Sequence, residues 1–255
     1  MTTKTIYALS AGALFCCAAP LSAFHPMTTE DTVFIGRDVK QAEIGFDHTE
    51  DTDAADYFSN TLSATFSYGL WDKLEILISA PWQGWNSAGL SESGLGDVAL
   101  ETKFWVAERR GWDLALKPGF SLPAGNDAAG LGAGKGQVWL YCIAGRAEGP
   151  RQYYLNAGYR YNRNSVNEET DIFSASAMGA VELLPKTLLA AELAVETNTD
   201  KSAASPPVSS LLGLVWSPNP SLDLDAGVRY GLNDAAEELS LILGATVRFG
   251  SPEKM

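Results

Sequence analysis

The feature that most constrains this chain is an alternation of apolar and polar residues in short segments. In residues 221–231, SLDLDAGVRYG, apolar side chains stand at even positions while Asp223 and Asp225 stand at odd ones. A period of two predicts a β-strand with one apolar face and one polar face. In a soluble protein, Leu222 and Leu224 would lie in the core. In a membrane barrel, the same leucines would face lipid and the aspartates would face a wet lumen.

About twelve such segments recur along the chain, each roughly as long as a strand that crosses a membrane. They span residues 39–48, 61–69, 73–82, 96–108, 112–122, 136–146, 152–162, 171–183, 187–197, 208–217, 221–231 and 238–249. An even number of alternating strands is typical of an outer-membrane barrel. The pattern predicts one all-β domain over residues 38–249, a transmembrane antiparallel up-and-down β-barrel of about twelve strands.

The connections between these segments alternate in length. Short turns with Gly, Pro or Asp cover residues 70–72, 108–111, 147–151, 184–186 and 217–220. Longer polar connections cover residues 49–56, 83–95, 123–135, 163–170 and 198–207, and 233–237 is a short member of this second group. Outer-membrane barrels have short periplasmic turns and long external loops, whereas a soluble sandwich has no reason to sort its loops by parity. The loop lengths favour the membrane barrel, and a soluble ligand-binding barrel remains the alternative.

Aromatic residues gather near the ends of the predicted strands. Rings with a polar edge prefer the level of the lipid headgroups, so a membrane barrel carries two aromatic girdles. Trp105 and Tyr141 fit this placement less well. The residues that we expect at the membrane interface are Tyr68, Trp71, Trp82, Trp85, Trp112, Phe120, Tyr153, Trp216, Tyr230 and Phe249.

The polar face of the strands carries many charges, which a packed soluble core could not bury unpaired. The predicted lumen-lining residues are Glu43, Asp47, Glu75, Asp97, Glu101, Lys103, Asp113, Lys117, Arg160, Glu182, Glu192, Asp223, Asp225, Arg229 and Arg248. Acids outnumber bases in this set, so an open lumen would prefer cations or neutral solutes. Alternatively, the acids pair with the bases and seal the lumen. The first case predicts a channel for passive passage of small molecules, and the second a non-conducting structural or ligand-binding barrel.

The N-terminal residues have the features of a secretory signal. Residues 1–23 contain Lys4, an apolar run over residues 6–19 and small residues before a cleavage site after Ala23. No later apolar run is long enough for a membrane-spanning helix. We therefore expect export to the outer membrane of a Gram-negative bacterium. The predicted segment 24–37 would lie in the periplasm or act as a partial plug, and residues 250–255 would form a C-terminal tail.

Composition argues against several other classes of function. The net charge of −13 disfavours nucleic acid as a partner, because nucleic-acid binding needs a basic face. His25 and His48 are the two histidines in the sequence, and no Gly-x-Ser-x-Gly motif occurs, so we expect no enzyme. The glycine-rich residues 130–136 lack the Ser or Thr that a phosphate-binding loop places after its Lys. We expect no metal ion and no cofactor.

Several short motifs resemble the MetA-pathway phenol-degradation family of outer-membrane proteins. They are HPMTTEDT (25–32), GLGD (94–97) followed by Lys103 and Phe104, LPAGNDAAGLGAGKG (122–136) and NAGYRYN (156–162). The resemblance implies an outer-membrane barrel associated with passage of aromatic or other small hydrophobic compounds, and it supplies no catalytic residues. The chain departs from the family at residues 33–35 and continues past its last aromatic, Phe249.

The same reasoning gives the expected partners. A membrane barrel contacts the lipid bilayer of the outer membrane and a small-molecule solute. The barrel assembly machinery, which commonly recognises a terminal aromatic residue, would act during biogenesis. Either the tail after Phe249 is tolerated in the periplasm, or Phe249 is recognised at its internal position.

Overall fold

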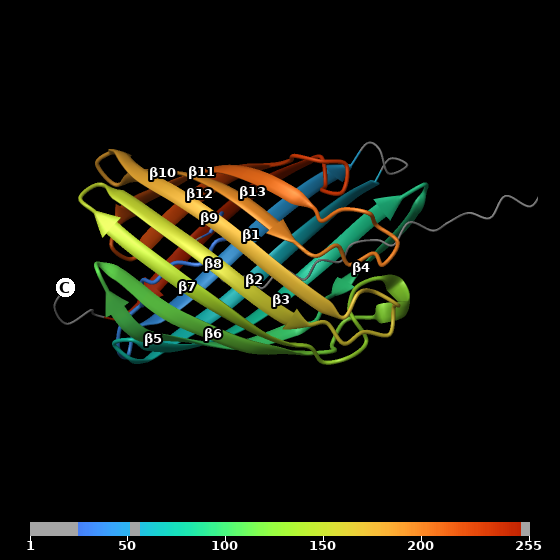
Figure 1. Cartoon of the computed structure of the whole chain (residues 1–255), viewed down its shortest axis with the longest axis horizontal. Helices are drawn as coiled ribbons and strands as arrows, with labels where there is room; N and C mark the ends of the chain where they lie inside the picture. Colours follow the sequence, from blue (N-terminus) through green and yellow to red (C-terminus); the bar gives the residue numbers. More distant parts are fainter. Residues whose placement is uncertain (1–24, 52–56, 251–255) are drawn as a thin grey trace, which may run out of the picture.

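The structure is a computed structural model that describes residues 25–51 and 57–250. It confirms the predicted all-β fold, because the strands form one antiparallel sheet that closes on itself (Figure 1). The strands are β1 (Lys40–Asp51), β2 (Tyr57–Trp71), β3 (Leu74–Ser87), β4 (Leu90–Leu95), β5 (Val98–Arg109), β6 (Trp112–Leu122), β7 (Val138–Glu148), β8 (Arg151–Tyr161), β9 (Asp171–Leu184), β10 (Thr187–Glu196), β11 (Val208–Asn219), β12 (Leu222–Gly231) and β13 (Leu239–Phe249).

Each wall strand pairs with its neighbours in sequence, and the first pairs with the last. Gly45 in β1 lies opposite Gly244 in β13, which closes the barrel and leaves no long free edge. β4 and β5 both pair with β3, as two halves of one wall strand. The thirteen strand segments therefore build the twelve-stranded barrel that the sequence predicts.

The break between β4 and β5 has a cause in the neighbouring strand. Pro81 in β3 has no backbone N–H, so it cannot donate to the strand beside it. The Gly96 N–H still donates to the Pro81 carbonyl at 2.8 Å. A Cβ on Gly96 would stand 2.8 Å from Pro81 Cγ, so only glycine fits there. The wall bulges at this point, and Asp97 lies buried at the bulge.

The two faces of the wall are inverted relative to a soluble protein. The large apolar side chains on the outside are exposed, as for Phe66 at 45% and Leu224 at 38% of their surface. Many inward-facing side chains are polar, such as the buried Thr65 and Asp225, and they stand among buried apolar ones such as Leu211. Leu224 therefore lies on the outer, lipid-facing surface and the aspartates of the same strand face the lumen.

Most of the predicted interface aromatics lie on this outer surface. Those with exposed rings are Trp71, Trp82, Phe120, Tyr153, Trp216, Tyr230 and Phe249. The Tyr68 hydroxyl donates to Asp38 at 2.9 Å at the end where β1 begins. Trp112 is half-buried and follows the parity of its outward-facing neighbours in β6.

Trp85 is the exception, because it faces the lumen instead of the membrane interface. It lies three residues after the outward-facing Trp82, and an odd spacing along a strand turns a side chain to the opposite face. The sequence predicts a loop over residues 83–95, which include Trp85. The structure instead continues β3 through this stretch and forms a hairpin with β4, with a tight turn at Ala88 and Gly89, whose φ angles are 51° and 81°.

The remaining connections follow the predicted parity. In Figure 1 the short turns lie at the left end of the barrel and the long loops at the right, near the β4 label. The loop after β6 contains one turn of 3₁₀ helix, η1 (Asp127–Ala129). In the described part of the chain, no helix is long and apolar enough to span a membrane. The predicted signal, residues 1–23, and the tail after Gly250 lie outside the described residues.

Candidate functional site

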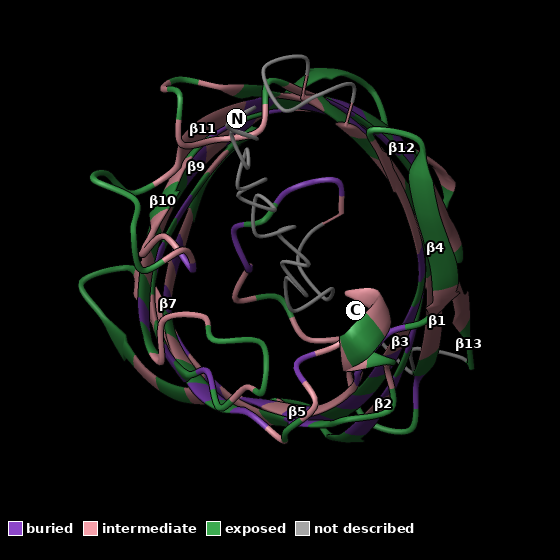
Figure 2. Ribbon diagram, turned by 90° about the vertical axis from the view of Figure 1, so that its right-hand side faces the viewer, coloured by how far each residue is buried: buried purple, intermediate pink, exposed green. Residues whose placement is uncertain are grey.

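Residues 25–37, which we name the internal segment, lie inside the barrel. Figure 2 looks along the barrel and shows this stretch within the ring of strands. Most of its residues are buried or half-buried, and Thr28, Val33 and Arg37 are exposed. The segment is tied to the wall by backbone pairing where it joins β1, with the Asp38 N–H donating to the Gly69 carbonyl at 2.9 Å. The sequence allows residues 24–37 to lie in the periplasm or to act as a partial plug. The described residues of this stretch, 25–37, make their contacts inside the lumen.

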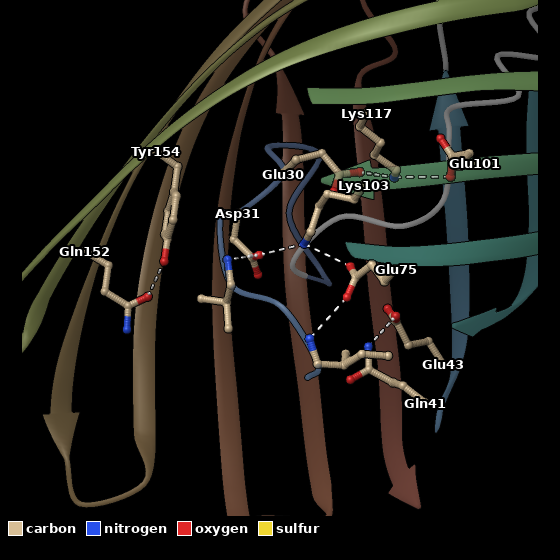
Figure 3. Close-up of polar contacts among 12 residues, drawn as sticks. Glu30, Asp31, Gln41, Glu43, Glu75, Glu101, Lys103, Lys117, Gln152 and Tyr154 are labelled. Atoms are coloured by element: carbon tan, nitrogen blue, oxygen red, sulfur yellow. Dashed lines mark hydrogen bonds and ion pairs between the residues drawn. The ribbon is translucent and has the colours of Figure 1, made fainter. Parts of the chain in front are cut away.

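Two buried lysines of the wall hold the middle of the internal segment (Figure 3). Lys117 in β6 contacts Glu30 at 2.5 Å and the wall residue Glu101 at 3.2 Å. Lys117 is 0% exposed, so water cannot solvate its ammonium group. The two carboxylates take the place of water in stabilising its charge.

Lys103 in β5 repeats this arrangement one position along the segment. Its Nζ lies 3.1 Å from Asp31 and 3.2 Å from Glu75 in β3. The Ile35 N–H donates to the same Glu75 carboxylate at 3.1 Å. Each of the two lysines therefore joins one acid of the wall to one acid of the internal segment.

Two further acids of the wall are satisfied by donors from the internal segment. His25 Nδ1 lies 2.5 Å from Asp225 Oδ1 in β12. The Thr29 N–H donates to Glu192 in β10 at 2.6 Å. Both carboxylates are buried, so without the segment they would need water or another donor.

An apolar contact fixes the segment between these polar ones. Met27 is 3% exposed and belongs to a buried cluster with Tyr154, Met178, Ala180, Ala190, Leu211 and Ile242. Burying a methionine side chain contributes about 1.5–3 kcal/mol.

The wall leaves room for the internal segment by placing glycines where it passes. A Cβ on Gly213 would stand 2.1 Å from Met27 Cε, and one on Gly244 would stand 2.2 Å from His25 Nδ1. Neither distance is possible between real atoms, so a larger residue at either position would displace the segment. The inner-face glycines whose added Cβ would meet the segment are Gly45, Gly69, Gly145, Gly213, Gly227 and Gly244.

Other predicted lumen residues pair with each other along the wall. Asp47 and Arg229 lie 3.3 Å apart, and Asp223 and Arg248 lie 2.6 Å apart. Glu43 accepts a hydrogen bond from the neighbouring Gln41 side chain at 2.8 Å. The pairing is partial, because the acids of the wall outnumber its bases.

Two predicted lumen acids lie at the short-turn end. Asp113 accepts a hydrogen bond from the indole of Trp105 at 2.8 Å, so this tryptophan also faces inward. Glu182 is exposed and accepts from the Lys186 N–H at 3.2 Å in the turn after β9. Glu182 therefore lies at the rim of the barrel, bound to a turn.

At the opposite end of the lumen lie residues 123–135, which we name the mouth loop. Asp97, at the wall break, accepts hydrogen bonds from the Gly125 N–H at 3.0 Å and from the Ala133 N–H at 2.9 Å. The Trp85 indole donates to the Ala129 carbonyl at 2.9 Å. Below the loop lies a cavity of about 250 Å³, whose lining includes Arg160, also predicted from sequence.

The contribution of the internal segment was missed by strand-based reasoning. Alternation identifies wall residues, but His25, Glu30 and Asp31 precede the first strand and carry no period. The available signal was the acidic run ending at Asp31 together with two inward lysines that need partners. Within residues 25–51 and 57–250, no three His, Cys, Asp or Glu side chains cluster in a way that could hold a metal ion.

Comparison with known proteins agrees with this geometry. Residues 28–249 match the family described as "Putative MetA-pathway of phenol degradation", and the chain belongs to this family. A search of curated proteins gives no match.

Solved structures resemble the fold at low sequence identity. An outer membrane channel from Pseudomonas putida F1 has a TM-score of 0.68 and 16% identity, covering 86% of this chain and 98% of that one. The KdgM porin has a TM-score of 0.55 and 10% identity, covering 82% and 99%. The NanC porin has a TM-score of 0.56 and 9% identity, covering 82% and 98%. The fold is thus that of Gram-negative outer-membrane barrels, which contact the lipid bilayer.

Proposed function

We propose that this protein is a channel for passive passage of small molecules across the outer membrane, closed at rest by its internal segment. The observation that carries the proposal is the way the segment is held. Hydrogen bonds and ion pairs that involve side chains fix residues 25–35 to the wall. If the segment were instead a strand of the wall, it could leave only by breaking the sheet. Such contacts can break and be replaced by contacts with water while the wall stays folded. The segment can therefore leave the lumen while the sheet of the barrel stays intact.

The charge of the open lumen follows from the same contacts. When the internal segment leaves, Asp225 and Glu192 lose their donors, and Lys103 and Lys117 keep one wall acid each. The wall then presents a surplus of carboxylates, which repels anions and favours cations or uncharged solutes. The family description supports the more specific proposal that aromatic or other small hydrophobic compounds are among the solutes.

The alternative is a non-conducting structural or ligand-binding barrel, favoured by the complete burial of Lys117. Lys117 is fully buried and has two carboxylate partners, so removing one of them by releasing the segment costs much free energy. In this alternative the internal segment stays in place permanently and the lumen is sealed by salt bridges.

We propose no catalytic role for the histidines. His25 and Asp225 form two members of a possible triad, but the nearby Ser63 hydroxyl donates to the Gly45 carbonyl at 3.2 Å and is buried. His48 lies at the end of β1 and is bound to Asn60 at 2.9 Å. Neither arrangement presents a nucleophile to a substrate.

Single-channel recording of refolded protein tests the proposal. Glu30→Gln with Asp31→Asn removes the segment's half of both lysine clamps but leaves Glu101 and Glu75 in place. We expect discrete, cation-preferring steps that are more frequent than in the unsubstituted chain. Asp72→Asn, in an exposed turn, is the matched control and should behave as the unsubstituted chain. Silence from both proteins, when heat-modifiable gel mobility shows them folded, would support the sealed barrel instead.

A further inference from the structure

The inner wall carries an apolar area that is separate from the buried lysines. We name it the apolar patch, and its residues are all buried: Tyr154 in β8, Met178 and Ala180 in β9, Ala190 in β10, Leu211 in β11 and Ile242 in β13. The two buried lysines and their wall acids lie instead on β3, β5 and β6. An apolar solute in the lumen would therefore find its contacts on β8–β13.

Strand pairing makes the apolar patch continuous. Met178 lies directly beside Tyr154, and Ala180 lies directly beside Ala190. On β12, the inward position between the patch residues of β11 and β13 is Gly227, which has no side chain to interrupt the surface. Tyr154 supplies an aromatic ring, and Met178 supplies a polarisable thioether, both of which make favourable contacts with other rings. The patch therefore suits a flat apolar ring.

Two apolar residues of the internal segment cover this patch. Met27 packs in the same buried cluster, and its Cε lies 2.1 Å from the position of a Cβ added to Gly213. Pro26 is buried as well, and its Cγ lies 2.9 Å from a Cβ added to Gly227. The neighbouring contacts of the segment with β10 and β12 are polar. Met27 and Pro26 thus fill the apolar site that the wall would otherwise present to the lumen.

Charges at the border of the patch bear on which ring it accepts. Glu192 is buried and lies between Met178 and Leu211 in the strand register. When the segment leaves, this carboxylate loses its backbone donor and would repel an aromatic anion. Arg229, directly across from Leu211, already pairs with Asp47 at 3.3 Å and so offers an anion little compensation. An uncharged ring is therefore favoured over an anionic one.

We propose that the apolar patch binds a small, uncharged aromatic solute in the open lumen, and that Met27 and Pro26 occupy the same site at rest. Either occupant removes apolar surface from water, so both are driven to the patch by the same effect. Solute and internal segment then compete for one surface, and the solute stabilises the open state because it binds that state better. This inference rests on the proposed channel function and assigns a binding site to it.

Fluorine NMR on the full mature chain in detergent tests the binding. The uncharged probe is para-fluorophenol, and the anionic comparator of similar size is para-fluorobenzoate. In Met27→Ala the probe no longer has to displace a side chain that fills the patch. We expect this variant to bind the probe saturably and about tenfold more tightly than the unsubstituted chain, because its binding-competent state is more populated. The comparator should show no saturable binding.

A filled patch should abolish binding of the probe. Gly213→Val in the Met27→Ala background places a side chain in the space that Met27 Cε vacates. Gly179→Val in the same background is the matched control, because no atom lies within 4 Å of its added Cβ, and it should leave probe binding unchanged. Equal binding by these variants would overturn the proposed site. So would equally tight binding of para-fluorobenzoate, or the lack of saturable probe binding by folded Met27→Ala.

Single-channel recording of the unsubstituted chain provides a second measurement, should Met27→Ala fail to fold. Open probability should rise severalfold with para-fluorophenol and stay constant with para-fluorobenzoate. A conducting chain whose open probability para-fluorophenol leaves unchanged would overturn the competition and leave the channel intact. Saturable probe binding by a chain that never conducts would refute the proposed channel and leave the site intact.

Discussion

The middle of the lumen and its mouth both bury polar side chains, and the two regions stabilise them in different ways. In the middle, full charges lie buried and are neutralised by ion pairs between wall and internal segment, as at Lys117 and Lys103. At the mouth, Arg160 and side-chain amides line a cavity of about 250 Å³, and the mouth loop is held by hydrogen bonds. The middle is filled by the protein itself, whereas the mouth keeps a cavity beneath its loop.

The largest effect is expected from removing a charge in the middle of the lumen. Lys117→Met leaves Glu30 and Glu101 buried without their cation, which costs about 3–5 kcal/mol of stability. Urea titration of the refolded barrel in detergent should show this loss. Lys73→Met, whose ammonium lies over the Trp105 ring at the short-turn end, should cost less than a quarter as much. Equal losses would show that the Lys117 clamp has no special role.

A steric change should separate the internal segment from the wall without changing any charge. Gly213→Val places a side chain where Met27 lies, and overpacking of this kind costs about 1–3 kcal/mol. The docking equilibrium should shift by about 5–150-fold, and open probability in single-channel recordings should rise accordingly. Gly179→Val is the control, because no atom lies within 4 Å of its added Cβ. An unchanged open probability for Gly213→Val would contradict the proposed closing role.

At the mouth, the change that tests the comparison is Asp97→Asn. Asn keeps the shape but turns one acceptor into a donor facing a backbone N–H, at a cost of about 1.5–3 kcal/mol for a charge-assisted bond. Hydrogen exchange at the Gly125 and Ala133 amides should become about ten- to hundredfold faster, while exchange near Met27 stays slow. Faster exchange in both regions would mean that mouth and middle are coupled and do not act separately.

The smallest effect concerns pH. Burial raises the pKa of Glu237, in the loop before β13, to about 7. Below pH 7 this carboxyl is neutral, so the mouth carries one negative charge fewer and cation preference should decline slightly as pH falls. Reversal potentials at pH 6 and pH 8.5 measure this, and the difference should be smaller in Glu237→Gln than in the unsubstituted chain. A larger cation preference at pH 6 than at pH 8.5 would contradict this role of Glu237.

The barrel was predictable because its wall obeys one rule repeated many times. Alternation gave nearly every strand, and inward parity put Lys103 and Glu75 on the same face, where they meet. The rule failed where the period is absent or shifted. Trp85 was assigned to the membrane interface because its stretch was interpreted as a loop, and the hairpin that continues β3 turns it inward.

The internal segment could not be positioned from sequence for a different reason. Its residues are held by side chains from strands far apart in the chain, such as Asp225 and Glu75, and no local pattern encodes such contacts. The mouth cavity likewise depends on three loops meeting, which needs the closed barrel as a frame. Charge type was predictable in both regions, but the choice of partners was not.

The most direct test of the central claim is to lock the internal segment and then release it. Met27→Cys with Leu211→Cys joins two members of the same buried cluster, in a Cys142→Ser background that removes the exposed native thiol. Single-channel conductance should be absent while the disulfide is formed and should appear after reduction. Equal currents before and after reduction, from protein shown to be cross-linked, would contradict closure of the lumen by the internal segment.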